Sequence, residues 1–242
     1  MEIKIIYQDK NFIAINKPAG LLVHASSYQK TDEPTLIDWL LENFPQVKKV
    51  GDPSISSGQV TYERPGIVHR LDRDTSGIML IPLNQEYFSY LKKLFQEKKI
   101  KKTYLVIVRG TVKERKGRIE KPIGIKSGTT KRSVFSEKMA KEAITEYKLV
   151  RNFQKNGQEY SLLEVSPLTG RTHQIRVHLA SIGHPVIGDK LYGGKTVTVL
   201  APRQMLHCLS LELELEPGKS VKLETDLPDD FYKILGKIPA NL

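Results

Sequence analysis

Two short clusters of charged side chains contain most of the residues that could do chemistry. The first has the sequence GIVHRLDRDTSG, residues 66–77, and lies between a loop rich in proline and glycine and an apolar run. Catalytic and binding residues are often found on loops that rigid elements hold in place. The cluster is therefore either a surface turn with arginine and aspartate pairs or a site built around an acidic side chain.

A metal site is one possible use of this first cluster. Asp72 and Asp74 form an Asp-x-Asp pair, as in phosphotransferases that bind a divalent cation. Arg70 and Arg73 add positive charge beside these carboxylates, and that charge competes with a metal ion. A single carboxylate kept ionised by arginine fits the sequence better than a metal-binding pair.

The second cluster has the sequence TGRTHQIRVH, residues 169–178, and includes the start of a helix predicted over 172–182. Arginines and histidines at a helix N-terminus suit the binding of a phosphate or a carboxylate. His173 and His178 would lie about 140° apart around a helix axis, and no His-Glu-x-x-His pattern is present. We therefore expect no zinc site, and we favour a satisfied, partly buried side chain for each histidine.

The charge of the chain is concentrated in one segment. The 242 residues carry a formal net charge of +11 at pH 7. Residues 92–132 hold fifteen lysines and arginines against three glutamates, a local net charge of +12, which leaves the remainder close to neutral. This concentration favours a polyanionic partner, and nucleic acid is the leading candidate, ahead of a merely solvated basic surface. Glycines and a proline interrupt the segment, which disfavours a membrane-binding amphipathic helix.

Several other classes of protein are disfavoured by what the sequence lacks. It has no phosphate-binding Gly-x-x-x-x-Gly-Lys-[Ser/Thr] loop, no Gly-x-Gly-x-x-Gly and no Gly-x-Ser-x-Gly nucleophile elbow. No apolar run approaches the roughly 20 residues of a membrane helix, and the first residues do not resemble a signal peptide. The single cysteine, Cys208, cannot form an internal disulfide. We therefore expect a cytoplasmic location.

Local patterns predict the elements that position the two clusters. Thr35 and Asp38 form a capping box at the start of a helix that Pro45 ends. Apolar periodicity in the first half also predicts strands at 3–7, 12–15 and 76–81, a helix over 87–95 and, from composition, a polar loop over 52–65.

The second half of the chain is predicted to consist mostly of strands. Asn156-Gly157 lies between the β-rich runs 143–147 and 160–165 and is a strong hairpin signal. Further predicted elements are strands at 104–108 and 209–215, the helix over 172–182 and a short helix after Pro228. Because strands dominate and several connections are hairpins, we expect an α+β fold with a mixed, mainly antiparallel sheet and flanking helices.

Taken together, these motifs resemble those of the RluA-type pseudouridine synthases. Two more segments agree, in the right order: NKPAGLLVH, residues 16–24, and the KTY motif at 102–104 followed by Gly110. The run GHPVIGDKLYG, residues 183–193, is also typical of the family. The resemblance covers about residues 3–215. It implies the pseudouridine synthase fold with a central catalytic cleft, and an enzyme that isomerises uridine in RNA to pseudouridine.

The resemblance also implies roles for single residues. The family's catalytic aspartate falls on Asp72, and the arginine that keeps it ionised falls on Arg176, with Arg171 as the runner-up. Tyr104 corresponds to the tyrosine that stacks on the target base and relays the proton from C5. Arg70 corresponds to the residue that enters the RNA stack in place of the extruded uridine. The same motifs assign substrate binding to further residues, namely His69, Thr75, Lys102, Arg171 and His173.

The resemblance implies neither a cofactor nor a metal, because the reaction moves no electron and no phosphate. We expect a single catalytic domain over residues 1–242, without the S4-like RNA-binding domain of many ribosomal members. We expect a monomer that acts on transfer RNA or 23S ribosomal RNA, with residues 92–132 as the hypothetical RNA-gripping surface. The alternative is a non-catalytic RNA-binding or ribosome-assembly factor on the same fold, which would not need the site residues intact.

Overall fold

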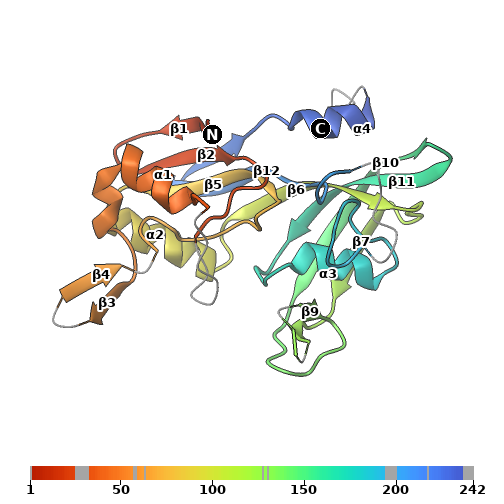
Figure 1. Ribbon diagram of the computed structural model, residues 1–242, viewed down its shortest axis with the longest axis horizontal. Helices are drawn as coiled ribbons and strands as arrows, with labels where there is room; N and C mark the ends of the chain where they lie inside the picture. The colour runs from red at the N-terminus through yellow and green to blue at the C-terminus, as the bar shows by residue number, and fades with distance from the viewer. Residues whose placement is uncertain are drawn as a thin grey trace. The chain divides into compact units, whose positions relative to one another are not determined.

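The chain forms two compact units (Figure 1). Unit 1 contains Met1–Ile100 and Ser210–Thr225, and unit 2 contains Lys101–Leu209 and Asp226–Leu242. Each unit is therefore built from segments that are distant in the sequence. The computed structural model describes residues 2–24, 33–56, 59–62, 64–126, 128–129, 131–193, 201–216 and 218–236.

Unit 1 is built on a sheet whose central strands, β2 and β5, are almost entirely buried. The strand order is β1-β2-β5-β12, and β13 pairs with β12. The bounds are β1 (Lys4–Gln8), β2 (Phe12–Lys17), β5 (Ser76–Pro82), β12 (Leu206–Glu216) and β13 (Lys219–Glu224). Of β12, the residues from Ser210 onward belong to unit 1. All residues of β5 are buried, and β5 pairs antiparallel with β2, with Lys17 opposite Gly77. The polar segments that follow β2 and precede β5 therefore meet at one end of the sheet.

Two capped helices belong to unit 1. In α1 (Leu36–Asn43) the Thr35 hydroxyl accepts a hydrogen bond from the Asp38 backbone N–H, and the Asp38 carboxylate accepts from the Thr35 backbone N–H. This confirms the predicted capping box. The Asn84 side chain caps α2 (Gln85–Gln96), which buries one apolar stripe in the unit. A short 3₁₀ helix, η1 (Pro45–Lys49), follows α1.

The segment 52–65 is not the loop that its composition predicts. It contains β3 (Pro53–Ser56) and β4 (Gln59–Tyr62), which pair antiparallel with Pro53 opposite Tyr62. Proline is tolerated at the first residue of a strand, where its missing N–H does not interrupt the ladder. Side-chain composition did not reveal this hairpin, because strand formation depends on the surrounding structure as well as on residue type.

Unit 2 contains a second run of antiparallel strands in the order β6-β11-β10-β7. Asn156 and Gly157 connect β10 to β11 with φ values of 51° and 71°, the left-handed conformations that a two-residue hairpin turn requires. The predicted hairpin is thereby confirmed. The bounds are β6 (Lys101–Arg109), β7 (Lys116–Glu120), β8 (Gly124–Ile125), β9 (Arg132–Ser133), β10 (Ile144–Lys155) and β11 (Gln158–Pro167).

One helix packs against each face of this sheet. Helix α3 (Gln174–Ser181) places Ile175 and Leu179 in a cluster with Val106 and Val108 of β6. Helix α4 (Asp229–Leu235) packs instead in a cluster with the alternate residues of β6, Leu105 and Ile107. Because successive side chains of a strand point to opposite faces, α3 and α4 cover opposite sides of the sheet.

Together, the described strands and helices form an α+β fold with a mixed, mainly antiparallel sheet, as the sequence predicts. Most of the predicted elements are present, with ends shifted by a few residues. Within the part of the chain that the structure describes, no helix is long and apolar enough to span a membrane.

Two buried histidines make the stability of unit 2 depend on pH. Burial and the charge of Arg203 lower the pKa of His207 to about 3, and burial also lowers the pKa of His178. Below about pH 6.5 the unfolded chain therefore binds protons that the folded chain does not, so acidification favours unfolding. Each histidine contributes about 1.4 kcal/mol per pH unit until its folded pKa is reached.

We expect His207→Gln to reduce this pH dependence. Denaturant unfolding between pH 7 and pH 5 should show a free energy of unfolding that falls less steeply with acidification in the variant. Parallel curves for the variant and the unchanged protein would contradict the assignment of His207 as a histidine buried in its neutral form.

Candidate active site

Asp72 lies in a tight turn just before β5. Its backbone carbonyl accepts a hydrogen bond from the Thr75 N–H at 3.1 Å. The Asp72 side chain is half-buried, whereas Leu71 and Thr75 on either side are buried. The buried neighbours anchor the turn and leave the carboxylate partly open to solvent.

A buried lysine holds this turn against the loop that follows β2. The Lys17 ammonium is fully buried and donates to the carbonyls of Pro18, Leu21 and Arg73 at 2.8 to 2.9 Å. The Gly20 N–H also donates to the Arg73 carbonyl, at 2.9 Å. A buried charge is tolerated only when hydrogen bonds replace its hydration. Lys17 therefore positions the residue next to Asp72, a role that its place in the sequence did not indicate.

The two residues before Asp72 have different environments. The His69 ring stacks on Phe95, with centroids 4.4 Å apart, and its Nε2 accepts from the Leu80 N–H at 2.9 Å. These contacts fix the backbone of the turn to α2 and β5. Arg70 is exposed, and its guanidinium donates to Nε2 of His24 at 2.9 Å.

Tyr104 lies on β6, in unit 2. Its backbone is opposite Val165 of β11, and its half-buried ring packs against the cluster on the α3 face of the sheet. Lys102 is two residues earlier on the same strand and therefore points to the same face. It is also half-buried.

Arg176 is buried in α3 and forms a bidentate ion pair with Asp189. The distances are 2.7 Å from Nε to Oδ2 and 2.8 Å from Nη2 to Oδ1, and both side chains are at most 5% exposed. Burial by itself raises the pKa of Asp189, but the hydrogen bonds and charge of Arg176 outweigh burial and hold that pKa below its ordinary value. Asp189 is thus ionised and fixes the plane of the guanidinium.

The backbone around Asp189 is as constrained as its side chain. The N–H groups of Leu191 and Tyr192 donate to Oδ1 at 2.8 and 3.1 Å. Gly188 has φ of 73°, and a Cβ there would lie 1.8 Å from the Arg203 carbonyl oxygen, so only glycine fits. The family-like run 183–193 contains these residues, but nothing in the sequence singles out Asp189 as the partner of Arg176.

Tyr192 links this ion pair to His173. Its ring lies under the Arg176 guanidinium, 5.1 Å from Cζ to the centroid. Its hydroxyl is 2.9 Å from Nδ1 of His173 and accepts from the Arg132 N–H at 3.0 Å. His173 itself has φ of 58° and precedes α3. The helix therefore begins at Gln174 and not at residue 172 as predicted, because a left-handed residue cannot continue a right-handed helix.

The other polar residues of the second cluster organise the same region. The Arg171 guanidinium donates from Nε to the Glu142 carbonyl at 2.9 Å. His178 is fully buried, and its two ring nitrogens contact the Thr145 hydroxyl and the Lys121 carbonyl, both at 2.9 Å. His178 is therefore satisfied, as predicted, but its side chain is fully and not partly buried.

The predicted site residues form two groups. The group in unit 1 is His69, Arg70, Asp72 and Thr75, all on the turn before β5. The group in unit 2 is Lys102, Tyr104, Arg171, His173 and Arg176, on β6 and around the start of α3. Within each unit, motifs that are distant in the sequence converge.

The basic segment 92–132 is divided between the units. Residues 92–100 belong to unit 1 and residues 101–132 to unit 2. Carboxylates neutralise several of its cations in the pairs Lys92–Asp52, Lys93–Glu97, Lys99–Glu97 and Arg118–Glu146. The segment is therefore not one continuous surface within a unit.

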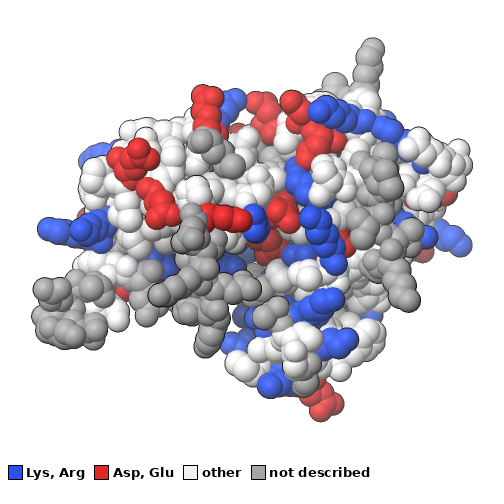
Figure 2. Space-filling view, viewed as in Figure 1, with Lys and Arg blue, Asp and Glu red and all other residues white. Residues whose placement is uncertain are grey.

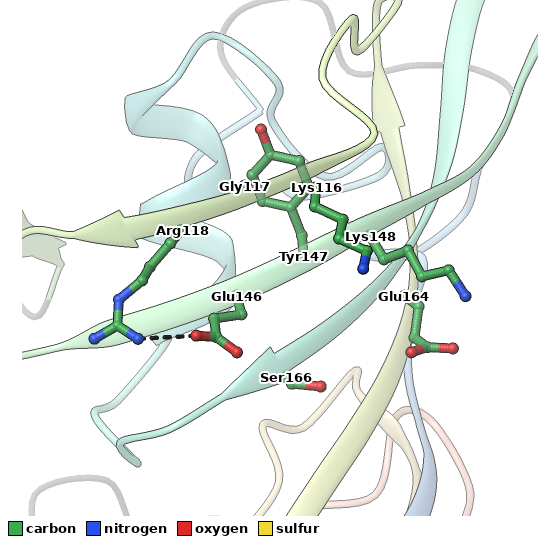
Figure 3. Close-up of a pocket in the computed structure, with 8 residues that line it drawn as sticks. All are labelled: Lys116, Gly117, Arg118, Glu146, Tyr147, Lys148, Glu164 and Ser166. Carbon is green, nitrogen blue, oxygen red and sulfur yellow. Dashed lines mark hydrogen bonds and ion pairs between the residues drawn. The ribbon is translucent and has the colours of Figure 1, made fainter.

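A separate pocket of about 490 Å³ opens on unit 2 (Figure 3). It is lined by Lys116, Gly117, Arg118, Glu146, Tyr147, Lys148, Glu164 and Ser166. Glu164 and Ser166 alternate along β11 with Val165, which faces α3, so their side chains point to the opposite face. None of the predicted site residues lines this pocket.

The family model described as RNA pseudouridylate synthase matches residues 11–181, and the chain belongs to this family.

Known proteins resemble the chain over most of its length. An uncharacterized RNA pseudouridine synthase of Aquifex aeolicus is 42% identical over 207 residues, 86% of this chain and 60% of the relative. Ribosomal large subunit pseudouridine synthase D of Borreliella burgdorferi is 36% identical over 233 residues, 96% of this chain and 68% of the relative. The chain thus spans about two thirds of the length of these relatives.

Solved structures show the same fold. The structure of human RNA Pseudouridylate Synthase Domain Containing 1 superposes with a TM-score of 0.73 at 26% sequence identity. The match covers 94% of this chain and 84% of the human chain.

Proposed function

We propose that this protein isomerises uridine in RNA to pseudouridine. The observation that carries the proposal is the family match over residues 11–181, which include Asp72, Tyr104 and Arg176. In this reaction the bond from N1 of uracil to C1′ of ribose breaks, and a bond from C5 to C1′ forms. The proton on C5 leaves and N1 ends with a proton, so the atoms balance without a cofactor.

Asp72 is the proposed catalytic residue, and Arg176 its charge partner. A bound substrate removes water from a half-buried carboxylate, and a guanidinium beside it replaces part of the lost hydration. Asp189 holds the Arg176 guanidinium by two hydrogen bonds, which supports a fixed charge at this position. Three alternative first steps of the reaction are compatible with Asp72: attack on C1′, addition to the uracil ring, or removal of a sugar proton.

Arg70 and Tyr104 are proposed to stabilise an everted nucleotide. The glycosidic carbon cannot be reached inside a stacked helix, so the base must leave the stack at a cost of a few kcal/mol. An exposed arginine can fill the place of the base, and an aromatic ring can stack on it. The exposure of Arg70 and the half-buried ring of Tyr104 support these roles.

The remaining predicted residues are proposed to bind or position the substrate. Lys102 shares the face of β6 with Tyr104, and Arg171 and His173 lie just before α3. The contacts of His69 with Leu80 and Phe95 support a positioning role for that residue. We further propose that the two units act as one catalytic domain, in a cytoplasmic monomer.

The RNA substrate is proposed to be 23S ribosomal RNA or transfer RNA. The test is to map pseudouridines in cellular RNA with and without the gene, and to treat RNA from the deletion strain with the purified protein. We expect specific sites to disappear on deletion and to return on treatment. Unchanged maps, together with RNA binding by the protein, would overturn the proposal in favour of a non-catalytic RNA-binding factor.

A further inference from the structure

Strand β7 forms the outer edge of the sheet in unit 2. It is the last strand in the order β6-β11-β10-β7, and within the described part of the chain only β10 pairs with it. The Leu149 N–H donates at 2.8 Å to the carbonyl of Arg115, the residue that precedes β7. Hydrogen-bonded and non-hydrogen-bonded pairs alternate along an antiparallel ladder, so Gly117 and Ile119 also bond to β10. The backbone N–H and C=O groups of the intervening residues therefore point away from the sheet, namely those of Lys116, Arg118 and Glu120.

The side chains of β7 face two different hollows. On one face, Lys116 and Arg118 line the pocket of about 490 Å³ described above, together with polar residues of β10 and β11 (Figure 3). On the other face, Ile119 lines a second pocket of about 470 Å³, whose walls include Val112 and Ile182. These three apolar residues belong to the cluster on the α3 side of the sheet. An extended chain beside β7 would therefore direct alternate side chains toward a polar and an apolar hollow.

The ring of Tyr147 lies over Gly117 in the middle of β7. The two residues are directly opposite each other in the ladder, and a Cβ at Gly117 would overlap the ring. Only glycine leaves room for the ring, which lines both pockets. The ring therefore offers an apolar contact to a side chain that an added strand would place opposite Gly117.

Two lysines at this edge have no carboxylate partner. Lys116 of β7 and Lys148 of β10 are directly opposite each other, and both line the polar pocket (Figure 3). Within the part of the chain that the structure describes, neither ammonium forms an ion pair, whereas Arg118 pairs with Glu120 and Glu146. Like charges directly opposite each other in a sheet are destabilising. The two lysines thus leave a positive charge that an acidic group would neutralise.

The edge of β7 suits a protein strand better than RNA. Figure 2 shows Lys and Arg side chains gathered in the lower part of the view, over the part of unit 2 where Figure 1 labels β9. The edge of β7 differs, because Glu120, Glu146 and Glu164 lie among its cations and would repel phosphates. Phosphates also cannot donate to the outward C=O groups, whereas the backbone of an extended peptide both donates and accepts.

We propose that the edge of β7 binds an extended segment of a partner protein as an additional antiparallel strand. The segment carries an acidic residue opposite Lys116 and aliphatic residues opposite Gly117 and Ile119. The acidic residue neutralises the lysine pair, and the aliphatic residues contact the Tyr147 ring and the apolar pocket. Lysines on an edge strand also reject basic or uncharged strands, which would leave the positive charge uncompensated. This inference is independent of the proposed function.

The probe is a fluorescently labelled peptide, acetyl-Thr-Val-Thr-Val-Glu-Val-Thr-amide. Its glutamate falls opposite Lys116 when its valines face the α3 side. N-methylation of the valines blocks only N–H groups that point away from β7, and it prevents self-association of the peptide. N-methylation of the glutamate and of the threonine two residues before it blocks N–H groups directed to β7. We expect the first methylated peptide to bind, and the second to bind at least about tenfold more weakly.

Hydrogen exchange of the complex identifies the backbone groups that take part. With the valine-methylated peptide at about ten times its Kd, exchange of the Lys116 and Arg118 amides should slow about tenfold, because their N–H groups become bonded. The Gly117 and Ile119 amides, which already bond to β10, should change much less.

A charge exchange tests the acidic position of the segment. Lys116→Glu should weaken binding of the glutamate peptide by about threefold or more. It should strengthen binding of a matched peptide that carries lysine in place of the glutamate. Lys222→Glu is the control, since it makes the same change of charge on β13 in unit 1. This control should leave both affinities unchanged.

Each contrary result has a definite meaning. Equal binding of the two methylated peptides, or no binding of either, would overturn the inference. If no peptide binds and Lys116→Glu alone lowers RNA affinity, the edge belongs to RNA. If the unchanged protein forms a dimer that Lys116→Glu abolishes, the edge belongs to a second copy of the chain, and the inference is again wrong. Pseudouridine formation is measured separately, so its failure would overturn the proposed function and not this inference.

Discussion

Asp72→Asn is expected to abolish pseudouridine formation and to leave RNA affinity within about twofold. Asparagine has nearly the same size as aspartate but carries no charge, so it is neither a nucleophile nor a base. Loss of a positioned acid–base or nucleophilic group commonly lowers the rate by about 100- to 10,000-fold or more. The turn itself should persist, because backbone groups of residues 72 and 75 and the buried Lys17 hold it. Single-turnover assays with excess enzyme, beside equilibrium binding, measure the two effects separately.

Asp74→Asn is the matched control. Asp74 lies in the same turn and is half-buried like Asp72, so general damage to the turn would affect both variants. We expect the Asp74 variant to retain most of its activity. Comparable losses in both variants, with activity lost in a chelator, would point instead to a metal-binding carboxylate pair. Full activity of Asp72→Asn would contradict the assignment of the catalytic residue.

Asp189→Ala is expected to destabilise the protein by about 3 to 5 kcal/mol, because it removes the bidentate partner of a buried guanidinium. Asp189→Asn keeps the shape and one acceptor and should cost less. Glu146→Gln is the control, since its pair with Arg118 is exposed to solvent and should contribute little to stability. The free energy of unfolding from denaturant titrations is the measurement. Equal losses for the Asp189 and Glu146 variants would contradict this account.

The stability that the Arg176–Asp189 pair contributes depends on pH. The folded pKa of Asp189 is below its ordinary value, so its contribution is present above the unfolded pKa of about 3.9 and is lost as the pH falls through the folded pKa. The difference in stability between the unchanged protein and Asp189→Asn should therefore shrink below about pH 4.

Local signals predicted the local structure well. The capping box of Thr35 and Asp38 and the turn at Asn156-Gly157 are as predicted, because both depend on contacts within a few residues of the chain. The family resemblance, rather than spacing or charge alone, identified Asp72, Tyr104 and Arg176 as the candidate catalytic residues. His178 is satisfied by hydrogen bonds, as predicted, although its side chain is more buried than expected.

Other features depend on contacts between residues far apart in sequence, and only the folded chain decided them. Lys17 reaches the carbonyl of Arg73, 56 residues later, and Arg176 pairs with Asp189, 13 residues later. The pairing of β3 with β4, the left-handed His173 and the place of β7 at the edge of the sheet likewise follow from packing and not from composition. Sequence alone thus determined the family, the fold class and the residue types available for chemistry. The tertiary structure decided which charges are held in place, because burial and hydrogen-bond geometry exist only after distant segments have met.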